Sequence, residues 1–254
     1  MKTTAQIKAM KGKEKIAVLT AYDYSIGKAI DKSEIDIILV GDSLGMVVYG
    51  EEDTLNISIE DIEKATRAVS KASDNTMVVA DMPYKTYDTK AHALKNAKKL
   101  INAGAKAVKP ENSPEIVEFL VEEGVPVMGH IGLTPQTVHE FKVQGKDKES
   151  AKKILDDAKQ MEKAGVFSIV LECIPAKLAE LITSKVSIPT IGIGAGPGCD
   201  GQVLVSYDML GLYNELEPKF VKRYADISKD ITDAVDDYKQ EVKKGTFPAK
   251  EHSY

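Results

Sequence analysis

Two apolar runs of this 254-residue chain each end in an aspartate, and these acids are the first candidates for chemistry. The run at 37–40 leads into Asp42 and Ser43 ("VGDSLG"), and the run at 76–80 leads into Asp81. Two converging carboxylates repel each other unless a proton or a cation lies between them. Mg²⁺ prefers such oxygen ligands and keeps open water positions for a substrate. We therefore predict a Mg²⁺ site at Asp42 and Asp81, with helix or turn capping as the alternative for either residue.

Four further polar residues follow later apolar runs. Glu111, in "AVKPE", is a candidate third or water-mediated metal ligand, and Lys109 beside it could bind an anionic substrate, form a Schiff base or balance the acids. Glu172 emerges directly from the apolar run "IVLE", where partial desolvation would raise its pKa and suit a general base. Pairing with Lys109 is the alternative role for Glu172. His130 could donate a hydrogen bond, shuttle a proton or serve a structural role.

A bound cation beside an unpaired base predicts enolate chemistry. The cation would chelate the carboxylate and keto oxygens of a 2-oxo acid and stabilise the enolate while the base removes the adjacent proton.

Eight apolar runs alternate with helical patterns along the chain. The runs lie at 15–20, 36–41, 76–81, 105–110, 125–130, 167–172, 189–194 and 202–207, and helical spacing occurs at 58–73, 89–104, 113–124 and 149–165. Near-continuous apolar runs are typical of parallel strands covered on both faces. Eight such units predict a (β/α)8 barrel, whose active sites lie at the carboxyl ends of the strands. A doubly wound open sheet is the alternative.

Local signals mark several helix ends. Ser58 with Asp61 predicts a capping box, and Ser113 followed by Pro114 predicts another helix start. Glycines at three helix-to-strand junctions predict helix stops. Apolar spacing over 219–245 predicts one long C-terminal helix, which would pack on the barrel or bind a partner. We expect a single domain over 1–254, with an N-terminal capping segment and this C-terminal helix.

The composition excludes several classes of protein. The net charge of −5 and an isoelectric point near 5.5 argue against nucleic-acid binding. No apolar run approaches the roughly 20 residues of a membrane span, and the N-terminus does not resemble a signal peptide. Cys173 and Cys199 are too few for a disulfide framework and have no metal-type spacing. We therefore expect a cytoplasmic protein with two reduced thiols and no nucleic-acid or membrane partner.

Several longer strings resemble one enzyme family. "LTAYDYSIGKAIDKSEIDIILVGDSLGMVVYG", "VVADMPYKTY", "AVKPE", "PVMGHIGLTPQ", "IVLECIP" and "PTIGIGAGPGCDGQVLVSYDMLGL" are similar, in order and over about residues 3–228, to ketopantoate hydroxymethyltransferases. The resemblance implies a (β/α)8 TIM barrel of the phosphoenolpyruvate/pyruvate type that binds Mg²⁺. It also implies transfer of a one-carbon unit from 5,10-methylenetetrahydrofolate to 3-methyl-2-oxobutanoate. The product is 2-dehydropantoate, in pantothenate and coenzyme A biosynthesis.

The resemblance also implies roles for individual residues. Asp42 and Asp81 would be metal ligands and Glu111 a further, outer ligand. Contacts to the oxo acid would come from Asp42, Ser43, Asp81 and Lys109. Glu172 would be the proton acceptor and His130 would lie beside the substrate. A homo-oligomer, a decamer built from rings, is implied as well.

The chain departs from the family pattern at two places. Pro110 follows Lys109 where the family usually has leucine, and it restricts Lys109 to extended geometry. The segment 137–145 ("TVHEFKVQG") is three residues shorter than usual, which leaves folate and a modified pterin both open as the donor. The competing functions are a Mg²⁺-dependent carbon–carbon lyase of oxo acids, an aldolase using Lys109, and a non-enzymatic barrel. The lyases usually carry a catalytic cysteine string that is absent here.

Overall fold

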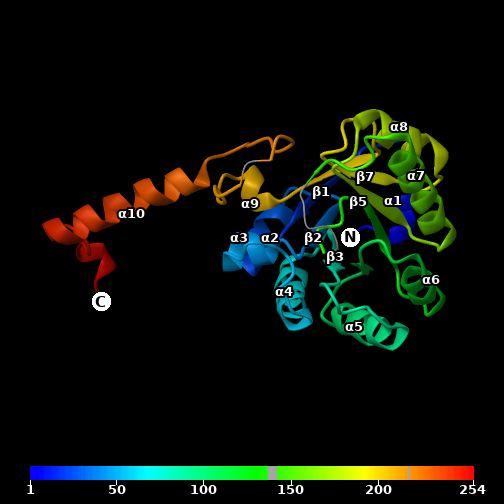
Figure 1. The fold of residues 1–254 in the computed structure, drawn as a ribbon. Coiled ribbons are helices and arrows are strands. Elements are labelled where there is room, and N and C mark those ends of the chain that lie inside the picture. The colour runs from blue at the N-terminus through cyan, green and yellow to red at the C-terminus, as the bar shows by residue number, and fades with distance from the viewer. Residues whose placement is uncertain (137–141, 217) are drawn as a thin grey trace. The chain divides into compact units, whose positions relative to one another are not determined.

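Eight strands and the helices between them make up most of this protein (Figure 1). The structure is a computed structural model that describes residues 1–136, 142–216 and 218–254. Its contacts divide the chain into two compact units, residues 1–205 and 206–254. A single domain over 1–254 stays a prediction. The shortened segment 137–145 lies partly outside the described residues.

All eight predicted strands are present. They are β1 (Ile16–Thr20), β2 (Ile37–Val40), β3 (Met77–Asp81), β4 (Ala107–Lys109), β5 (Met128–Gly132), β6 (Ser168–Glu172), β7 (Thr190–Ile193) and β8 (Gly201–Leu204). The helices of the first unit are α1 (Thr4–Ala9), α2 (Tyr24–Asp31), α3 (Leu44–Tyr49), α4 (Ile59–Ala72), α5 (Lys90–Asn102), α6 (Pro114–Glu122), α7 (Lys148–Lys163) and α8 (Ala176–Lys185). The second unit contains α9 (Ser206–Met209), α10 (Ile227–Lys244) and the 3-10 helix η1 (Lys250–His252).

The sheet closes into a barrel. The strand order is β4-β3-β2-β1-β8-β7-β6-β5, and every paired ladder is parallel. A parallel bridge between Val108 and Val127 joins the two remaining edges. Helices α4 to α8 surround the strands (Figure 1). The (β/α)8 prediction is confirmed and the open doubly wound sheet is wrong.

Every second strand residue points into the barrel and forms its core. The central cluster comprises Ile7, Met10, Ile16, Val18, Ile37, Leu39, Met77, Val79, Ala107, Met128, Phe167, Val170, Ile191 and Val203. Side chains alternate between the two faces of a strand, so residues two apart share the inner face. Ile7 and Met10 come from α1 and the residue after it, and they cover the amino ends of the strands. The inner-face pattern therefore leaves the carboxyl ends of the strands for polar residues.

The predicted helix signals agree with the structure. Ser58 and Asp61 form the expected capping box of α4, and Pro114 is the first residue of α6. Gly104, Gly124 and Gly165 have φ values of 117°, 80° and 92°. Glycine adopts this left-handed region without steric cost, so each helix can end there, a few residues before the next strand begins.

The C-terminal helix is shorter than predicted. Helix α10 begins at Ile227, with Asp226 accepting from the Lys229 N–H, so the predicted start at 219 is wrong. The preceding segment turns back on α9, because the Tyr224 N–H donates to the Met209 carbonyl. The apolar stripe of α10 is exposed at Ile231, Val235, Tyr238 and Val242. No helix in the described part of the chain is long and apolar enough to cross a membrane.

Candidate active site

The inner faces of four strands deliver the predicted polar residues to one end of the barrel. Asp81, Lys109, His130 and Glu172 each lie two residues after an inward-facing core residue: Val79, Ala107, Met128 and Val170. Because a strand repeats every two residues, the acids and bases continue the same inner face. Asp42 lies two residues after the end of β2, at the same rim. Lys109 ends β4, which agrees with the extended geometry expected before Pro110.

Asp42 and Asp81 are in direct contact. The Asp42 N–H donates to Asp81 Oδ2 over 3.1 Å, and both residues are buried. Burial raises the pKa of Asp81 to about 7; the nearby Lys109 ammonium opposes this shift and the Asp42 carboxylate adds to it. Lys109 Nζ lies 3.0 Å from Asp81 Oδ1, although the pair lacks hydrogen-bond alignment. The pair of aspartates therefore occupies a site where negative charge is costly.

The two aspartates suit a hard divalent cation. Asp81 Oδ1 is buried and has no hydrogen-bond partner, and oxygen donors are what Mg²⁺ prefers. Among the residues described, no cluster of three or more His, Cys, Asp and Glu side chains could hold an ion. Asp42 and Asp81 would be the residues that hold a cation here, and Mg²⁺ is commonly bound through one or two carboxylates.

Lys109 and Glu111 lie next to this pair and are also buried. Burial alone lowers the pKa of Lys109, but the carboxylates of Asp81, Asp42 and Glu111 raise it above its ordinary value. The ammonium group is therefore charged. Burial raises the pKa of Glu111 to about 9, with the Asp42 charge adding to the effect and Lys109 opposing it. Glu111 Oε1 lies 3.7 Å from His130 Nδ1.

His130 connects this acidic group to Glu172. Lys109 Nζ is 3.4 Å from His130 Nδ1, and His130 Nε2 is 3.0 Å from Glu172 Oε2. Burial and the Lys109 charge lower the pKa of His130, which favours a neutral ring. A neutral ring that accepts at Nδ1 carries its proton at Nε2, facing Glu172. Glu172 is thus next to His130, whereas Lys109 contacts Asp81.

Ser43 faces the site from the start of α3. Its Oγ lies 2.8 Å from the hydroxyl of Tyr22, a residue on the loop after β1. A side chain at Gly41 would have its Cβ 2.8 Å from Ser43 Oγ and 3.6 Å from Asp81 Oδ2. Glycine therefore lets the backbone approach the carboxylates closely.

Two buried residues of the site were not among the predicted ones. Gln136 donates to Asp42 Oδ2 over 2.7 Å, and Tyr87 donates to Gln136 Oε1 over 2.5 Å. Gln136 ends the string "GHIGLTPQ" and Tyr87 ends "PYKTY", both quoted for the family resemblance. The available signal was their place in those strings, because neither residue type suggests chemistry by itself.

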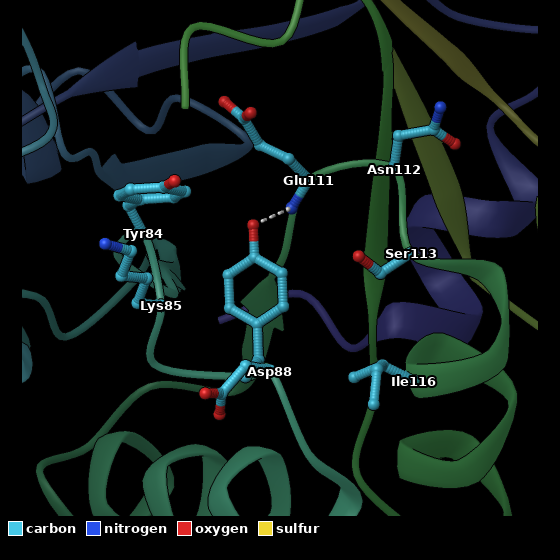
Figure 2. A pocket seen from close by; sticks show the side chains of 8 residues that line it. Tyr84, Lys85, Asp88, Glu111, Asn112, Ser113 and Ile116 are labelled. Carbon is cyan, nitrogen blue, oxygen red and sulfur yellow. Dashed lines mark hydrogen bonds between the residues drawn. The ribbon is translucent and has the colours of Figure 1, made fainter. Parts of the chain in front are cut away.

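A pocket of about 290 Å³ opens beside Glu111 (Figure 2). Figure 2 shows Tyr84 and Lys85 on one side and Ser113 and Ile116 on the other. The Tyr87 hydroxyl, which accepts from the Glu111 N–H over 3.2 Å, belongs to its wall. The wall of this pocket is therefore shared with the candidate active site.

Comparison with known proteins identifies the family. The model of the ketopantoate hydroxymethyltransferase family matches residues 1–250. A 3-methyl-2-oxobutanoate hydroxymethyltransferase of Clostridium novyi is 55% identical, and the alignment covers 99% of this chain and 94% of the relative. The enzyme of the same name from Enterococcus faecalis is also 55% identical, over 95% of this chain and 90% of the relative.

Solved structures share the fold at low identity. A phosphoenolpyruvate phosphomutase from Streptomyces platensis subsp. rosaceus has a TM-score of 0.66 and 12% identity, covering all of this chain and 92% of the other. A 2,3-dimethylmalate lyase of the PEP mutase/isocitrate lyase superfamily has a TM-score of 0.63 and 13% identity, covering all of this chain and 93% of the other. These similarities show the barrel fold. On the family match and the near-full-length relatives, the chain belongs to the ketopantoate hydroxymethyltransferase family and is a one-carbon transferase enzyme.

Proposed function

We propose that this enzyme transfers a one-carbon unit from 5,10-methylenetetrahydrofolate to 3-methyl-2-oxobutanoate. The product would be 2-dehydropantoate, in pantothenate and coenzyme A biosynthesis. The names of the relatives support the reaction and the pathway. The observation that carries the chemistry is the line of contacts from Glu172 through His130 and Lys109 to Asp81, which supports the proposal of a base beside a cation site.

The first task of the proposed mechanism is to hold the oxo acid. Asp42 and Asp81 would hold Mg²⁺, with Glu111 as an outer ligand. The bound Mg²⁺ would supply positive charge next to the keto oxygen, which acidifies the adjacent C–H bond. The charged Lys109 would contact the carboxylate end of the substrate, and the Ser43 hydroxyl would donate a hydrogen bond to it.

The second task is proton removal at C3. Glu172 would take this proton, and His130, whose Nε2 lies 3.0 Å from Glu172 Oε2, would stabilise the Glu172 carboxylate before the transfer. The carbon nucleophile at C3 would then attack the one-carbon unit of the donor. The bonds from this carbon to the two folate nitrogens would break, those nitrogens would take up protons, and water would supply the hydroxyl group of the product. Glu172 keeps 18% of its side chain exposed, so substrate can reach it.

The competing functions have less support. A Schiff-base aldolase needs a neutral lysine amine, whereas the carboxylates around Lys109 keep it protonated. The solved structures of a 2,3-dimethylmalate lyase share only the fold, at 13% identity, while the curated relatives with the transferase name reach 55%.

The test is hydrogen exchange at C3 of 3-methyl-2-oxobutanoate in D₂O, followed by proton NMR without folate. We expect loss of the C3 proton signal only when enzyme and Mg²⁺ are both present. Adding methylenetetrahydrofolate should then give 2-dehydropantoate. The same experiment with a modified pterin as the donor distinguishes the two donor classes.

Absence of both Mg²⁺-dependent exchange and product formation with either donor would contradict the proposed function. Release of pyruvate from a 2-methylisocitrate or oxaloacetate substrate would favour the lyase. Trapping by borohydride with full activity in the absence of metal would favour the aldolase.

Assembly and location are also proposals. We propose a homo-oligomer in the cytoplasm, decameric as the family resemblance implies. Cys173 and Cys199 are free, which agrees with a reducing compartment. Sedimentation velocity gives the molar mass of the assembly directly, and a monomer at micromolar concentration would contradict the decamer.

A further inference from the structure

Gln136 makes more contacts within the candidate site than its neutral side chain would suggest. The residue is 4% exposed. Its Nε2 donates to Asp42 Oδ2 over 2.7 Å and to the Met82 carbonyl over 3.1 Å. Its Oε1 accepts from the Tyr87 hydroxyl over 2.5 Å. The side-chain amide is therefore used at both ends.

These contacts lock the amide in one orientation. A reversed amide would set its oxygen against Asp42 Oδ2 and the Met82 carbonyl, which are both acceptors. Tyr87 reinforces the observed orientation, since its hydroxyl accepts from the Glu111 N–H and so has its proton available for Gln136. Gln136 is thus held by an arrangement that only one amide orientation satisfies.

Gln136 also connects the carboxylate of Asp42 to that of Glu111. Its backbone N–H donates to Glu111 Oε2 over 3.1 Å, while its side chain binds Asp42. Asp81 is oriented in a similar way, because its Oδ2 accepts from the Asp42 N–H. Each aspartate therefore has one oxygen, Oδ2, directed by an N–H donor. Asp81 Oδ1 accepts no hydrogen bond, although Lys109 Nζ lies 3.0 Å from it.

We propose that Gln136, supported by Tyr87, is a positioning residue that presets the carboxylates for a divalent cation. The inference rests on the proposed function, because it assumes that Asp42 and Asp81 bind the metal. A neutral amide can orient the Asp42 carboxylate by a hydrogen bond without cancelling its charge. Gln136 touches neither the cation nor the substrate in this role.

The decisive experiment measures metal affinity without turnover. Mn²⁺ and Mg²⁺ binding is titrated by calorimetry in the absence of substrate, for the wild type, Gln136→Leu and Tyr87→Phe. Loss of a group that orients a metal ligand typically weakens binding by about 10- to 100-fold, and we expect this range for Gln136→Leu. Tyr87→Phe should weaken binding less, because the amide keeps its own contacts. Gln160→Leu, the same change on an exposed surface of α7, should bind like the wild type.

A second readout separates positioning from general damage. In the C3 exchange assay, Gln136→Leu should need about 10- to 100-fold more Mg²⁺ for half-maximal rate. At saturating Mg²⁺ it should recover most of the wild-type rate. A variant with an unchanged Mg²⁺ requirement and a uniformly low rate would overturn the positioning role.

The outcomes also distinguish this inference from the proposed function. If the wild type neither binds Mg²⁺ nor shows exchange, the proposed function fails. If the wild type does both and folded Gln136→Leu binds metal equally well, only the inference fails. Should Gln136→Leu not fold, as judged by its thermal transition, an unchanged affinity in Tyr87→Phe would overturn the inference and a weakened one would support it.

Discussion

The pKa values of buried aspartates shift in opposite directions at the two ends of the barrel. At the amino end, Asp200 accepts from Lys11 Nζ over 2.8 Å, from the Thr190 N–H over 3.0 Å and from the Gly12 N–H over 3.3 Å. Burial raises its pKa, but these donors outweigh burial and hold the pKa below the ordinary value. At the carboxyl end, burial raises the pKa of Asp81 to about 7 and that of Glu111 to about 9.

The difference lies in the number of donors per carboxylate. Asp200 has a lysine and two backbone N–H groups to itself, whereas Asp42, Asp81 and Glu111 share one buried ammonium, that of Lys109. A buried carboxylate stabilises the fold when protein donors replace all the hydrogen bonds that water would have made to it. An incomplete set leaves charge that a ligand can neutralise, and this is typical of functional sites. Changes at the carboxyl end should therefore affect activity, and changes at the amino end should affect stability.

The largest effect is expected for Glu172→Gln. Removing the base should slow C3 exchange by about 10²- to 10⁴-fold, the usual contribution of a positioned general base. The thermal transition should stay close to that of the wild type, because Glu172 is partly exposed. Exchange rates come from NMR, with Glu118→Gln on the exposed surface of α6 as the matched control. Normal exchange in a folded Glu172→Gln variant would remove the base assignment.

Asp42→Asn should also abolish most activity, but with a different effect on stability. Loss of a metal ligand removes several kcal/mol of stabilisation of the developing charge, or about 10³-fold in rate. The Asp42 charge raises the pKa values of both Asp81 and Glu111, so its removal relieves repulsion. In metal-free buffer we expect a thermal transition equal to or above that of the wild type. A strongly destabilised variant would mean that Asp42 serves the fold.

Asp200→Asn should show the converse behaviour. Lys11 would lose its charged partner at a buried position, at a cost of about 2 kcal/mol in the free energy of unfolding. The change lies at the opposite end of the barrel from Glu172, so C3 exchange per folded molecule should be unchanged. Urea denaturation measures the first quantity and NMR the second. Equal stability of variant and wild type would break the comparison between the two ends.

The pH dependence of stability should have opposite signs at the two ends. The folded-state pKa of Asp200 is lowered, so its stabilisation is complete above the unfolded pKa of about 4 and is lost as the pH falls through the folded pKa. The folded-state pKa of Glu111 is raised from 4.5 to about 9, so stability falls as the pH rises between these values.

Denaturation in metal-free buffer between pH 3 and 9 tests both signs. The stability difference between the wild type and Asp200→Asn should shrink below about pH 4. Glu111→Gln should lose less stability than the wild type above neutral pH. Parallel curves for wild type and Glu111→Gln over this range would contradict the raised pKa.

The strands and their order along the chain follow from the sequence with little help from tertiary contacts. All eight strands lie within three residues of their predicted ranges, because uninterrupted apolar runs between capped helices have few alternative structures. Prediction failed at 219–226, where apolar spacing continues but the backbone turns back to pair with α9. Spacing reports which residues would share a helical face and not whether the backbone stays helical.

In the candidate site, too, some features follow from the sequence and others depend on tertiary contacts. The sequence by itself determined that Asp42, Asp81, Lys109, His130 and Glu172 end neighbouring strands, since strand ends in a parallel barrel share one rim. Only the tertiary structure decided their partners: Lys109 contacts Asp81 and not Glu172, and His130 contacts Glu172. It also revealed Gln136, whose role depends on hydrogen bonds to residues 94, 54 and 49 positions away. Such contacts are made by folding the chain, and no local pattern encodes them.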